Sequence, residues 1–372
     1  GWQRPTGEIF APIPSSNYHT ELPGQMLASI GYFGFWNYYL NTGDLQTIRD
    51  IYPRVKKYLG IWQKNSDGTI KFRAGEWTWG DWGDNIDIKV LFNAWYYIAL
   101  KGQRNMATAL DMKAEAEAID QEMQALKKAF NTVFWNGKAY RHPEYKLKTD
   151  DRVQALAIVS GLADEKKYPA LLNVLKQNEH ASPYMEKYVI EALFMMGENY
   201  YGMERMKRRF AEMVNDPERT TLYEGWGIGP NGFPGGTTNH AWSGGGLTIL
   251  SQYVCGVAPT EVGYKAYRIA PQPTGLKEAE TLVPTVKGNI KVSFKDDEKN
   301  FQLQVSSPQG AQATICLPSP CKAVTLNGEL VWQKGKKLLS GNSIIESIHQ
   351  EKNKTLSITM KNGGDWIFNA KK

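Results

Sequence analysis

The stretch that decides the fold of the first part of this chain runs from Met185 to Met196 and reads MEKYVIEALFMM. Within it Val189 and Leu193 continue the apolar spacing of Met185 at steps of four, and Met196 follows three residues later. Steps of three and four place side chains on one face of an α-helix. The same spacing recurs over residues 119–130. These stripes predict amphipathic helices whose apolar faces form the core.

Further helices are expected along residues 21–254. We predict roughly nine or ten of them, separated by turn-rich segments such as Asn65-Ser66-Asp67-Gly68. Strand-like alternation is missing between these helical stretches, which argues against a parallel sheet flanked by helices. Helical hairpins in series favour an all-α toroid whose loops line a central pocket.

The character of the chain changes near residue 255. Ten of its twelve tryptophans lie before that point, and a linker rich in proline and glycine is expected after Gly256-Val257-Ala258-Pro259, as far as about Gly275. We place the boundary between the two predicted domains after residue 258.

Beyond the linker, apolar and polar residues alternate over 301–305 and 356–360, and Asn327-Gly328 is a hairpin signal. Alternation with a period of two is typical of strands with one buried face. We therefore predict a helical domain over residues 1–258 and a small antiparallel β-sandwich domain over residues 259–372.

Composition excludes several classes of protein. The net charge of +6 is mild and no long basic run occurs, so a nucleic-acid partner is not expected. No apolar run approaches the roughly 18 residues that a membrane span needs. Three cysteines cannot build a disulfide framework. Motifs for phosphate loops, dinucleotides, paired metal ligands and nucleophilic serines are missing, so we expect neither a cofactor nor a metal.

One carboxylate, Glu224, lies between tyrosine and glycine in the run TTLYEGWG over residues 220–227, and TNHAWSGG follows over residues 238–245. Aromatic rings that cover the apolar side of a pyranose, glycines that let backbone approach a ligand and one acid together favour a sugar subsite. We predict that Glu224 is catalytic. The neighbours expected to line the subsite are Trp226, His240 and Trp242.

Each of these residues also has a structural interpretation. Glu224 could cap a helix or pair with an arginine. His240 could hydrogen-bond a sugar hydroxyl, orient Glu224, or cap the helix that follows it. A metal role for His240 is not expected, because no second histidine or cysteine stands at ligand spacing.

A second cluster, EWTWGDWGDN, covers residues 76–85. Its tryptophans suit stacking on sugar rings, and its aspartates suit hydrogen bonds from vicinal hydroxyls. The residues predicted to bind substrate are Trp79, Asp81, Trp82 and Asp84. The alternative is a loop that plugs the toroid with packed aromatic rings. Acids at the starts of other helices, such as Asp150, are interpreted chiefly as caps.

The two motifs around Glu224, the Gly80-Asp81-Trp82 motif, the segment from Gly263 to Pro271 and the stretch from Pro12-Ile13-Pro14 to Trp36 resemble the α-L-rhamnosidases of glycoside hydrolase family 78. The resemblance implies an (α/α)6 barrel followed by a C-terminal β-sandwich. It also implies inverting, metal-independent removal of terminal α-L-rhamnose from an oligosaccharide, polysaccharide or glycoside. Glu224 would be the general base, and the residues lining its subsite would be Trp79, Asp81, Trp82, Trp226, His240 and Trp242.

The sequence departs from the family pattern in one respect. The family carries its general acid on an Asp-x-x-x-x-Glu-Arg segment, which this chain lacks. We expect that segment, with roughly two barrel helices, to lie upstream of residue 1, and we expect little turnover of natural substrates by the chain alone. Family habit favours a periplasmic or secreted protein. The sequence leaves the aglycone and the oligomeric state open.

Three rival interpretations remain from the residues. A different (α/α)6 glycosidase would use Asp81 or Asp84 as its acid and would be active as this chain. A non-catalytic carbohydrate-binding protein would use Glu224 only to hydrogen-bond hydroxyls. A polysaccharide lyase would use Tyr223 and His240 as proton carriers.

Overall fold

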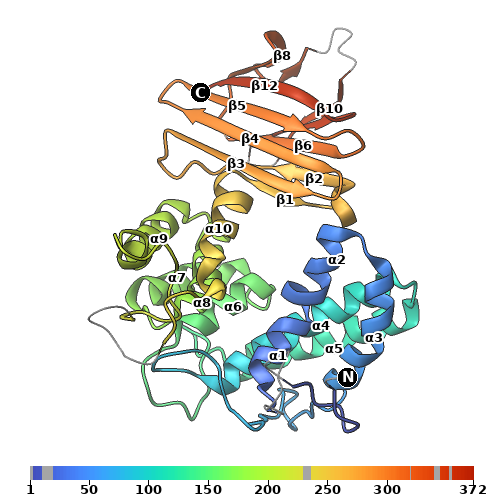
Figure 1. Cartoon of the computed structure of the whole chain (residues 1–372), viewed down its shortest axis with the longest axis vertical. Coiled ribbons are helices and arrows are strands. Elements are labelled where there is room, and N and C mark those ends of the chain that lie inside the picture. The colour runs from blue at the N-terminus through green and yellow to red at the C-terminus, as the bar shows by residue number, and fades with distance from the viewer. Residues whose placement is uncertain (1–2, 11–19, 229–235, 319, 339–343, 352–353) are drawn as a thin grey trace. The chain divides into compact units, whose positions relative to one another are not determined.

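The computed structural model describes residues 3–10, 20–228, 236–318, 320–338, 344–351 and 354–372. The Pro12-Ile13-Pro14 motif lies outside these residues. Two compact units make up the chain (Figure 1). The first contains Gly1–Tyr38 and Asp44–Gly245, and the second contains Tyr39–Gly43 and Gly246–Lys372. The boundary after residue 258 stays a prediction.

The first unit is built from helices. Its helices are α1 Pro23–Ile30, η1 Tyr32–Trp36, α3 Leu45–Leu59, α4 Ile88–Ala109, α5 Lys113–Val133, α6 Asp151–Ser160, η2 Glu165–Lys167, α7 Tyr168–Gln177, α8 Pro183–Met195, α9 Asn199–Val214 and η3 Ala241–Gly244. The chain passes between the units within α2 Asn37–Thr42 and α10 Gly245–Ile249. Within the described ranges these helices do not close into a complete barrel.

The predicted apolar stripes are confirmed as buried helix faces, except at Met196, which follows the end of α8 and is half-buried. The stripe over residues 119–130 lies in α5, and Met185, Val189 and Leu193 are fully buried in α8. The helix α4 packs against α1, α3, α5 and α6, while α8 packs against α6 and α9. Hydrophobic burial of this kind, worth about 1.5–3 kcal/mol for each large apolar side chain, stabilises the array of hairpins.

The helix α6 has a different character, because all ten of its residues are buried. It therefore shows no exposed polar face, and its charged first turn enters the interior. Asp150 is the N-cap of α6 and accepts a hydrogen bond from the Arg152 amide, which confirms the capping interpretation for this acid.

The N-terminal ends of α4, α6 and α8 are tied together by hydrogen bonds between their preceding loops. The Asp87 amide before α4 donates to Asp150 Oδ2 before α6, at 2.9 Å. The Ser182 amide before α8 donates to Asp81 Oδ2, at 2.8 Å. The loops before α4, α6 and α8 are therefore gathered at one end of the helices, as expected for a toroid.

The second unit contains two sheets. The five-stranded sheet has the order β1 Val257–Pro259, β2 Ala266–Ile269, β6 Gln312–Leu317, β11 Leu356–Met360 and β10 Ile345–Gln350. The seven-stranded sheet has the order β3 Glu278–Thr285, β4 Gly288–Asp296, β5 Asn300–Ser307, β12 Gly364–Lys371, β7 Ala323–Leu326, β8 Glu329–Gln333 and β9 Lys336–Lys337. Two short helices, η4 Leu250–Val254 and η5 Val262–Tyr264, complete the unit.

Alternate residues of these strands form the core, as the period of two predicts. Phe301, Leu303 and Val305 are buried on β5. The Tyr267 hydroxyl of β2 donates to Ser307 Oγ at the end of β5, so the two sheets face one another as a sandwich. The predicted hairpin turn is confirmed, since Asn327 and Gly328 join β7 to β8 with positive φ angles.

Two features differ from expectation. The segment from Thr260 to Gly275 is not a simple linker, because it contains η5 and β2. The sheets are also not purely antiparallel, since β2 pairs in parallel with β6. The chain leaves β2, builds β3–β5 in the other sheet and returns, a crossover that allows parallel pairing. None of the helices in the described ranges could cross a membrane.

Candidate active site

Three loops of the helical unit surround a pocket of about 670 Å³. One loop precedes α4, one precedes α8, and the third lies between α9 and η3. The lining residues are Trp82, Gly83, Asp84, His180, Ser182, Glu224, Gly225, Trp226, Ile228 and Gly236. Of the eight residues predicted to form the site, four line this pocket. They are Trp82, Asp84, Glu224 and Trp226.

Glu224 lies in a short pairing of two backbone segments. Its amide donates to the Thr237 carbonyl at 2.9 Å, and the His240 amide donates to the Leu222 carbonyl at the same distance. The carboxylate oxygen Oε2 accepts hydrogen bonds from the Thr237 amide (3.0 Å) and hydroxyl (3.1 Å). These contacts fix one oxygen, while Oε1 accepts no hydrogen bond from any residue in the described ranges. The side chain keeps 17% exposure toward the pocket.

His240 stands beside this carboxylate. Its Nδ1 lies 3.7 Å from Glu224 Oε2 and 2.6 Å from the Thr237 hydroxyl, so Thr237 bridges the two side chains. His240 occupies the N-cap position of η3 but makes no side-chain cap hydrogen bond, so the capping alternative is wrong. Among the described residues the titratable side chain beside the Glu224 carboxylate is this imidazole, and no arginine forms an ion pair with it.

The tryptophans divide into packed and open rings. Trp79 and Trp242 stack on one another, with ring centroids 5.4 Å apart and 17° between their planes. Tyr184 of α8 covers Trp242 from a centroid distance of 5.3 Å. Trp79 is only 6% exposed, whereas Trp82 is 37% exposed and lines the pocket. The cluster over residues 76–85 therefore both packs the interior and offers one ring to a ligand.

The two aspartates of this cluster also differ. Asp81 is 4% exposed, and both of its oxygens accept hydrogen bonds within the protein. Its partners are Ser182, through amide and hydroxyl, and the Arg152 guanidinium. Burial raises the pKa of Asp81 to about 6, although the charge of Arg152 lowers it. Asp84 has an exposed side chain on the pocket wall.

Trp226 forms the wall next to Glu224. Its indole nitrogen Nε1 donates to the Ala181 carbonyl at 2.7 Å, and the Arg209 guanidinium covers the ring 4.4 Å from its centroid. The ring is therefore held by the loop before α8.

In contrast, Tyr223 is buried and its hydroxyl donates to Asp216, which removes it from the pocket and contradicts the lyase interpretation.

Sequence reasoning missed four residues of this region. Thr237 holds Glu224, Ser182 and His180 line the pocket, and Arg152 binds the loop before α4. Burial lowers the pKa of His180, and its Nε2 is buried without a hydrogen-bond partner among the described residues. The available signal for Arg152 was its place directly after two aspartates, at the start of a largely apolar stretch. The described residues hold no cluster of three or more potential metal ligands.

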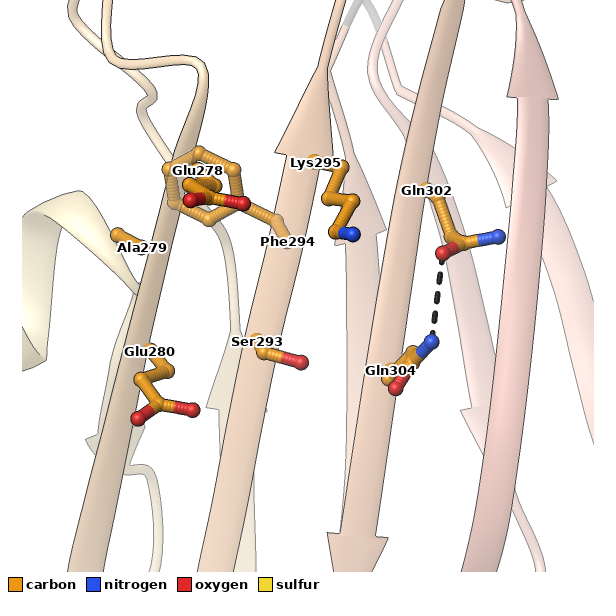
Figure 2. A pocket seen from close by; sticks show the side chains of 8 residues that line it. All are labelled: Glu278, Ala279, Glu280, Ser293, Phe294, Lys295, Gln302 and Gln304. Carbon is orange, nitrogen blue, oxygen red and sulfur yellow. Dashed lines mark hydrogen bonds between the residues drawn. The ribbon is translucent and has the colours of Figure 1, made fainter.

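A second hollow of about 420 Å³ lies on the seven-stranded sheet. Figure 2 shows that its polar side chains come from neighbouring strands β3, β4 and β5. Gln304 and Gln302 are joined by a hydrogen bond of 3.3 Å. The aromatic residue of its lining, Phe294, is buried in the core. A sugar would meet no exposed aromatic ring there, so the pocket at Glu224 is the stronger candidate.

Comparisons with known proteins identify the family to which the two units of this chain are similar. Residues 2–254 match the model of the bacterial alpha-L-rhamnosidase 6 hairpin glycosidase domain, and residues 256–328 match the bacterial alpha-L-rhamnosidase C-terminal domain. An alpha-L-rhamnosidase of Formosa agariphila is 21% identical and covers 83% of this chain. One of Alteromonas sp. is 24% identical and covers 85%. The chain spans 35% and 37% of the lengths of these two relatives.

Solved structures share the fold. The alpha-L-rhamnosidase from Dictyoglumus thermophilum superposes with a TM-score of 0.83 at 20% identity, and covers 100% of this chain and 42% of its own. The Streptomyces avermitilis alpha-L-rhamnosidase, solved with L-rhamnose, gives a TM-score of 0.73 at 18% identity, covering 90% of this chain and 32% of its own. The helical unit, the following β-domain and the two family models lead to one conclusion: this chain belongs to the bacterial α-L-rhamnosidase family, with a six-hairpin glycosidase domain and a C-terminal β-domain.

Proposed function

We propose that the protein carrying this chain is a glycosidase that removes terminal α-L-rhamnose from an oligosaccharide, polysaccharide or glycoside. The observation that carries the proposal is Glu224, whose carboxylate faces a pocket with one oxygen held by Thr237. The family match supports the choice of sugar, because the relatives named above are α-L-rhamnosidases.

Glu224 acts as the general base in this proposal. A carboxylate with one fixed oxygen and one unengaged oxygen can accept a proton from a water that attacks the anomeric carbon. His240 and Thr237 keep the carboxylate in place during that transfer. Attack by water on the face opposite the leaving group inverts the anomeric configuration.

The general acid would come from a segment N-terminal to this chain. Inverting glycosidases place their two carboxyl groups about 6.5–9.5 Å apart, so that a water fits between the base and the sugar. The pocket of about 670 Å³ has room for one sugar ring and that water.

The walls of the pocket provide the other contacts. Trp82 and Trp226 offer aromatic surface to the apolar side of a pyranose, and Asp84 offers a hydrogen-bond acceptor for hydroxyls. Trp79 and Trp242 support the site as the packed layer on which His240 rests, with the imidazole 4.3 Å from the Trp242 ring. No cofactor or metal takes part in the proposed reaction.

A panel of nitrophenyl glycosides tests the proposal. The chain, a longer protein that includes the sequence N-terminal to it, and Glu224→Gln in each are assayed together. We expect the longer protein to release nitrophenol from the α-L-rhamnoside and the Gln variant to lose that activity. Cleavage of another glycoside in preference to the rhamnoside would overturn the choice of sugar.

A second candidate uses Asp84 as the acid within this chain. It is favoured by one observation, that Asp84 and Glu224 line the same pocket. In this case the chain alone would cleave its substrate, and Asp84→Asn would abolish cleavage. Asp81, the other acid considered, accepts three hydrogen bonds in a buried site and cannot reach a substrate without breaking them.

A further inference from the structure

The most heavily engaged side chain near the pocket is Arg152, in the first turn of α6. Its guanidinium is fully buried, and Arg152 itself does not line the pocket. Nε donates to Asp150 at 2.7 Å, and Nη1 donates to Asp81 at 3.1 Å. The remaining N–H groups point at the loop that precedes α4.

That loop has little regular hydrogen bonding of its own. Gly83 and Asn85 adopt positive φ angles of 95° and 57°, so the backbone turns sharply beside the pocket. Arg152 Nη2 donates to the carbonyls of Asp84 (2.7 Å) and Asn85 (3.0 Å), and Nη1 donates to the Trp82 carbonyl at 3.4 Å. One side chain therefore satisfies three backbone carbonyls of this loop, those of Trp82, Asp84 and Asn85.

The hydrogen bonds around Arg152 and Asp81 also connect this loop to the other two loops of the pocket. Asp81, paired with Arg152, accepts the amide and hydroxyl of Ser182. The neighbouring Ala181 carbonyl accepts hydrogen bonds from Trp226 Nε1 (2.7 Å) and from Arg209 (2.6 Å). A continuous set of contacts thus links the Trp82 wall to the wall that carries Trp226 and Glu224.

We propose that Arg152 is a positioning residue, which sets the loop of Trp82 and Asp84 opposite Glu224 without touching the ligand. Burying a charge is costly, and ion pairs of this kind often add little net stability. The planar guanidinium explains the choice of residue, because its fork of donors can hold two carboxylates and three carbonyls at fixed angles. Lysine offers one nitrogen at the end of a flexible stem and cannot replace that fork.

Arg152→Lys tests the proposal, with Arg205→Lys as the matched control. Arg205 is also fully buried and pairs with Asp151 and Glu186, but none of its hydrogen bonds reaches a residue that lines the pocket. Hydrogen exchange of residues 80–86, thermal unfolding and binding of L-rhamnose by tryptophan fluorescence are measured for wild type and both variants.

We expect both variants to lower the unfolding temperature. Only Arg152→Lys should accelerate exchange in residues 80–86, by about tenfold, and weaken rhamnose binding by about tenfold, as the loss of one or two charged hydrogen bonds would do. If residues 80–86 exchange at the same rate in both variants, and both bind L-rhamnose with the same affinity, the proposal is wrong. Arg152 would then contribute only to stability. Should Arg152→Lys fail to fold, Ser182→Ala decides, since loss of the Asp81 contact must also accelerate exchange in residues 80–86.

The affinity measurement rests on the proposed function, but the exchange measurement does not. If wild type binds no L-rhamnose, the choice of sugar is contradicted. Faster exchange in residues 80–86 of Arg152→Lys would then still support the positioning role, and unchanged exchange would still refute it.

Discussion

Trp79 and Trp242 stack face to face, with centroids 5.4 Å apart and 17° between their planes. One belongs to the loop before α4 and the other to η3, so the two sequence motifs that suggested a sugar site meet in space. Through this contact the rings of Trp79 and Trp242 form one packed layer, and the His240 imidazole lies against the Trp242 ring. Neither motif alone shows which of its tryptophans faces a ligand.

The effects of substituting Trp79 and Trp242 on the free energy of unfolding should not be additive, because the two rings stack. Trp79→Leu and Trp242→Leu each lose ring packing, and the double variant should lose less than the sum. We expect a coupling free energy of about 0.5–1.5 kcal/mol, as for other aromatic pairs. Urea unfolding of wild type, both single variants and the double variant measures it. Strictly additive losses would show that the rings do not stabilise one another.

Thr237 should matter for catalysis through its hydroxyl. Thr237→Val keeps the shape and the backbone amide but removes the hydrogen bonds to Glu224 and His240. We expect kcat to fall by about tenfold, because a mispositioned base transfers its proton less effectively. Thr237→Ser keeps the hydroxyl and is the control. A valine variant as active as the serine variant would contradict a role for this hydroxyl.

Asp81 should give stability a distinctive pH dependence. Burial raises the pKa of its carboxyl to about 6 in the folded protein, above the unfolded value of about 4. The folded protein then binds this proton more tightly, so the contribution of Asp81 to the free energy of unfolding is fully present below pH 4 and is lost as the pH rises through 6. A rise of the pKa from about 4 to about 6 corresponds to roughly 3 kcal/mol of stability.

The comparison of wild type with Asp81→Asn isolates this effect. Asp87, whose pKa burial also raises to about 6, titrates in both proteins and cancels in the difference. The stability of wild type relative to the variant should therefore decline between pH 4.5 and pH 7 in urea titrations. A difference that stays constant over this range would show that Asp81 ionises at its ordinary pKa.

Much of the fold could be predicted from the sequence because its signals are local. Apolar spacing identified the buried faces of α5 and α8, and alternation identified β5. The wholly buried α6 offered no amphipathic pattern, since every face of it meets other residues. The strand β2 was mistaken for part of a linker because it is short and lies between Gly263 and Pro271.

The site could be predicted only in part. The composition around Glu224 pointed to a carboxylate in a pocket with aromatic walls, and the structure places it there. The roles of Asp81 and Arg152 depend on hydrogen bonds between residues far apart in the chain. Spacing carries no information on such contacts, so Asp81 was grouped with Asp84 although the fold buries one and exposes the other.

The most direct test of the central claim compares Glu224→Gln with wild type in the longer protein, with 4-nitrophenyl α-L-rhamnoside as substrate. Glutamine keeps the shape of the side chain but cannot accept the proton of water. We predict a fall in kcat of about 10²–10⁴-fold, the usual contribution of a general base, with little change in L-rhamnose affinity. Undiminished turnover by Glu224→Gln would contradict the assignment of Glu224 as the base and the account of this site built on it.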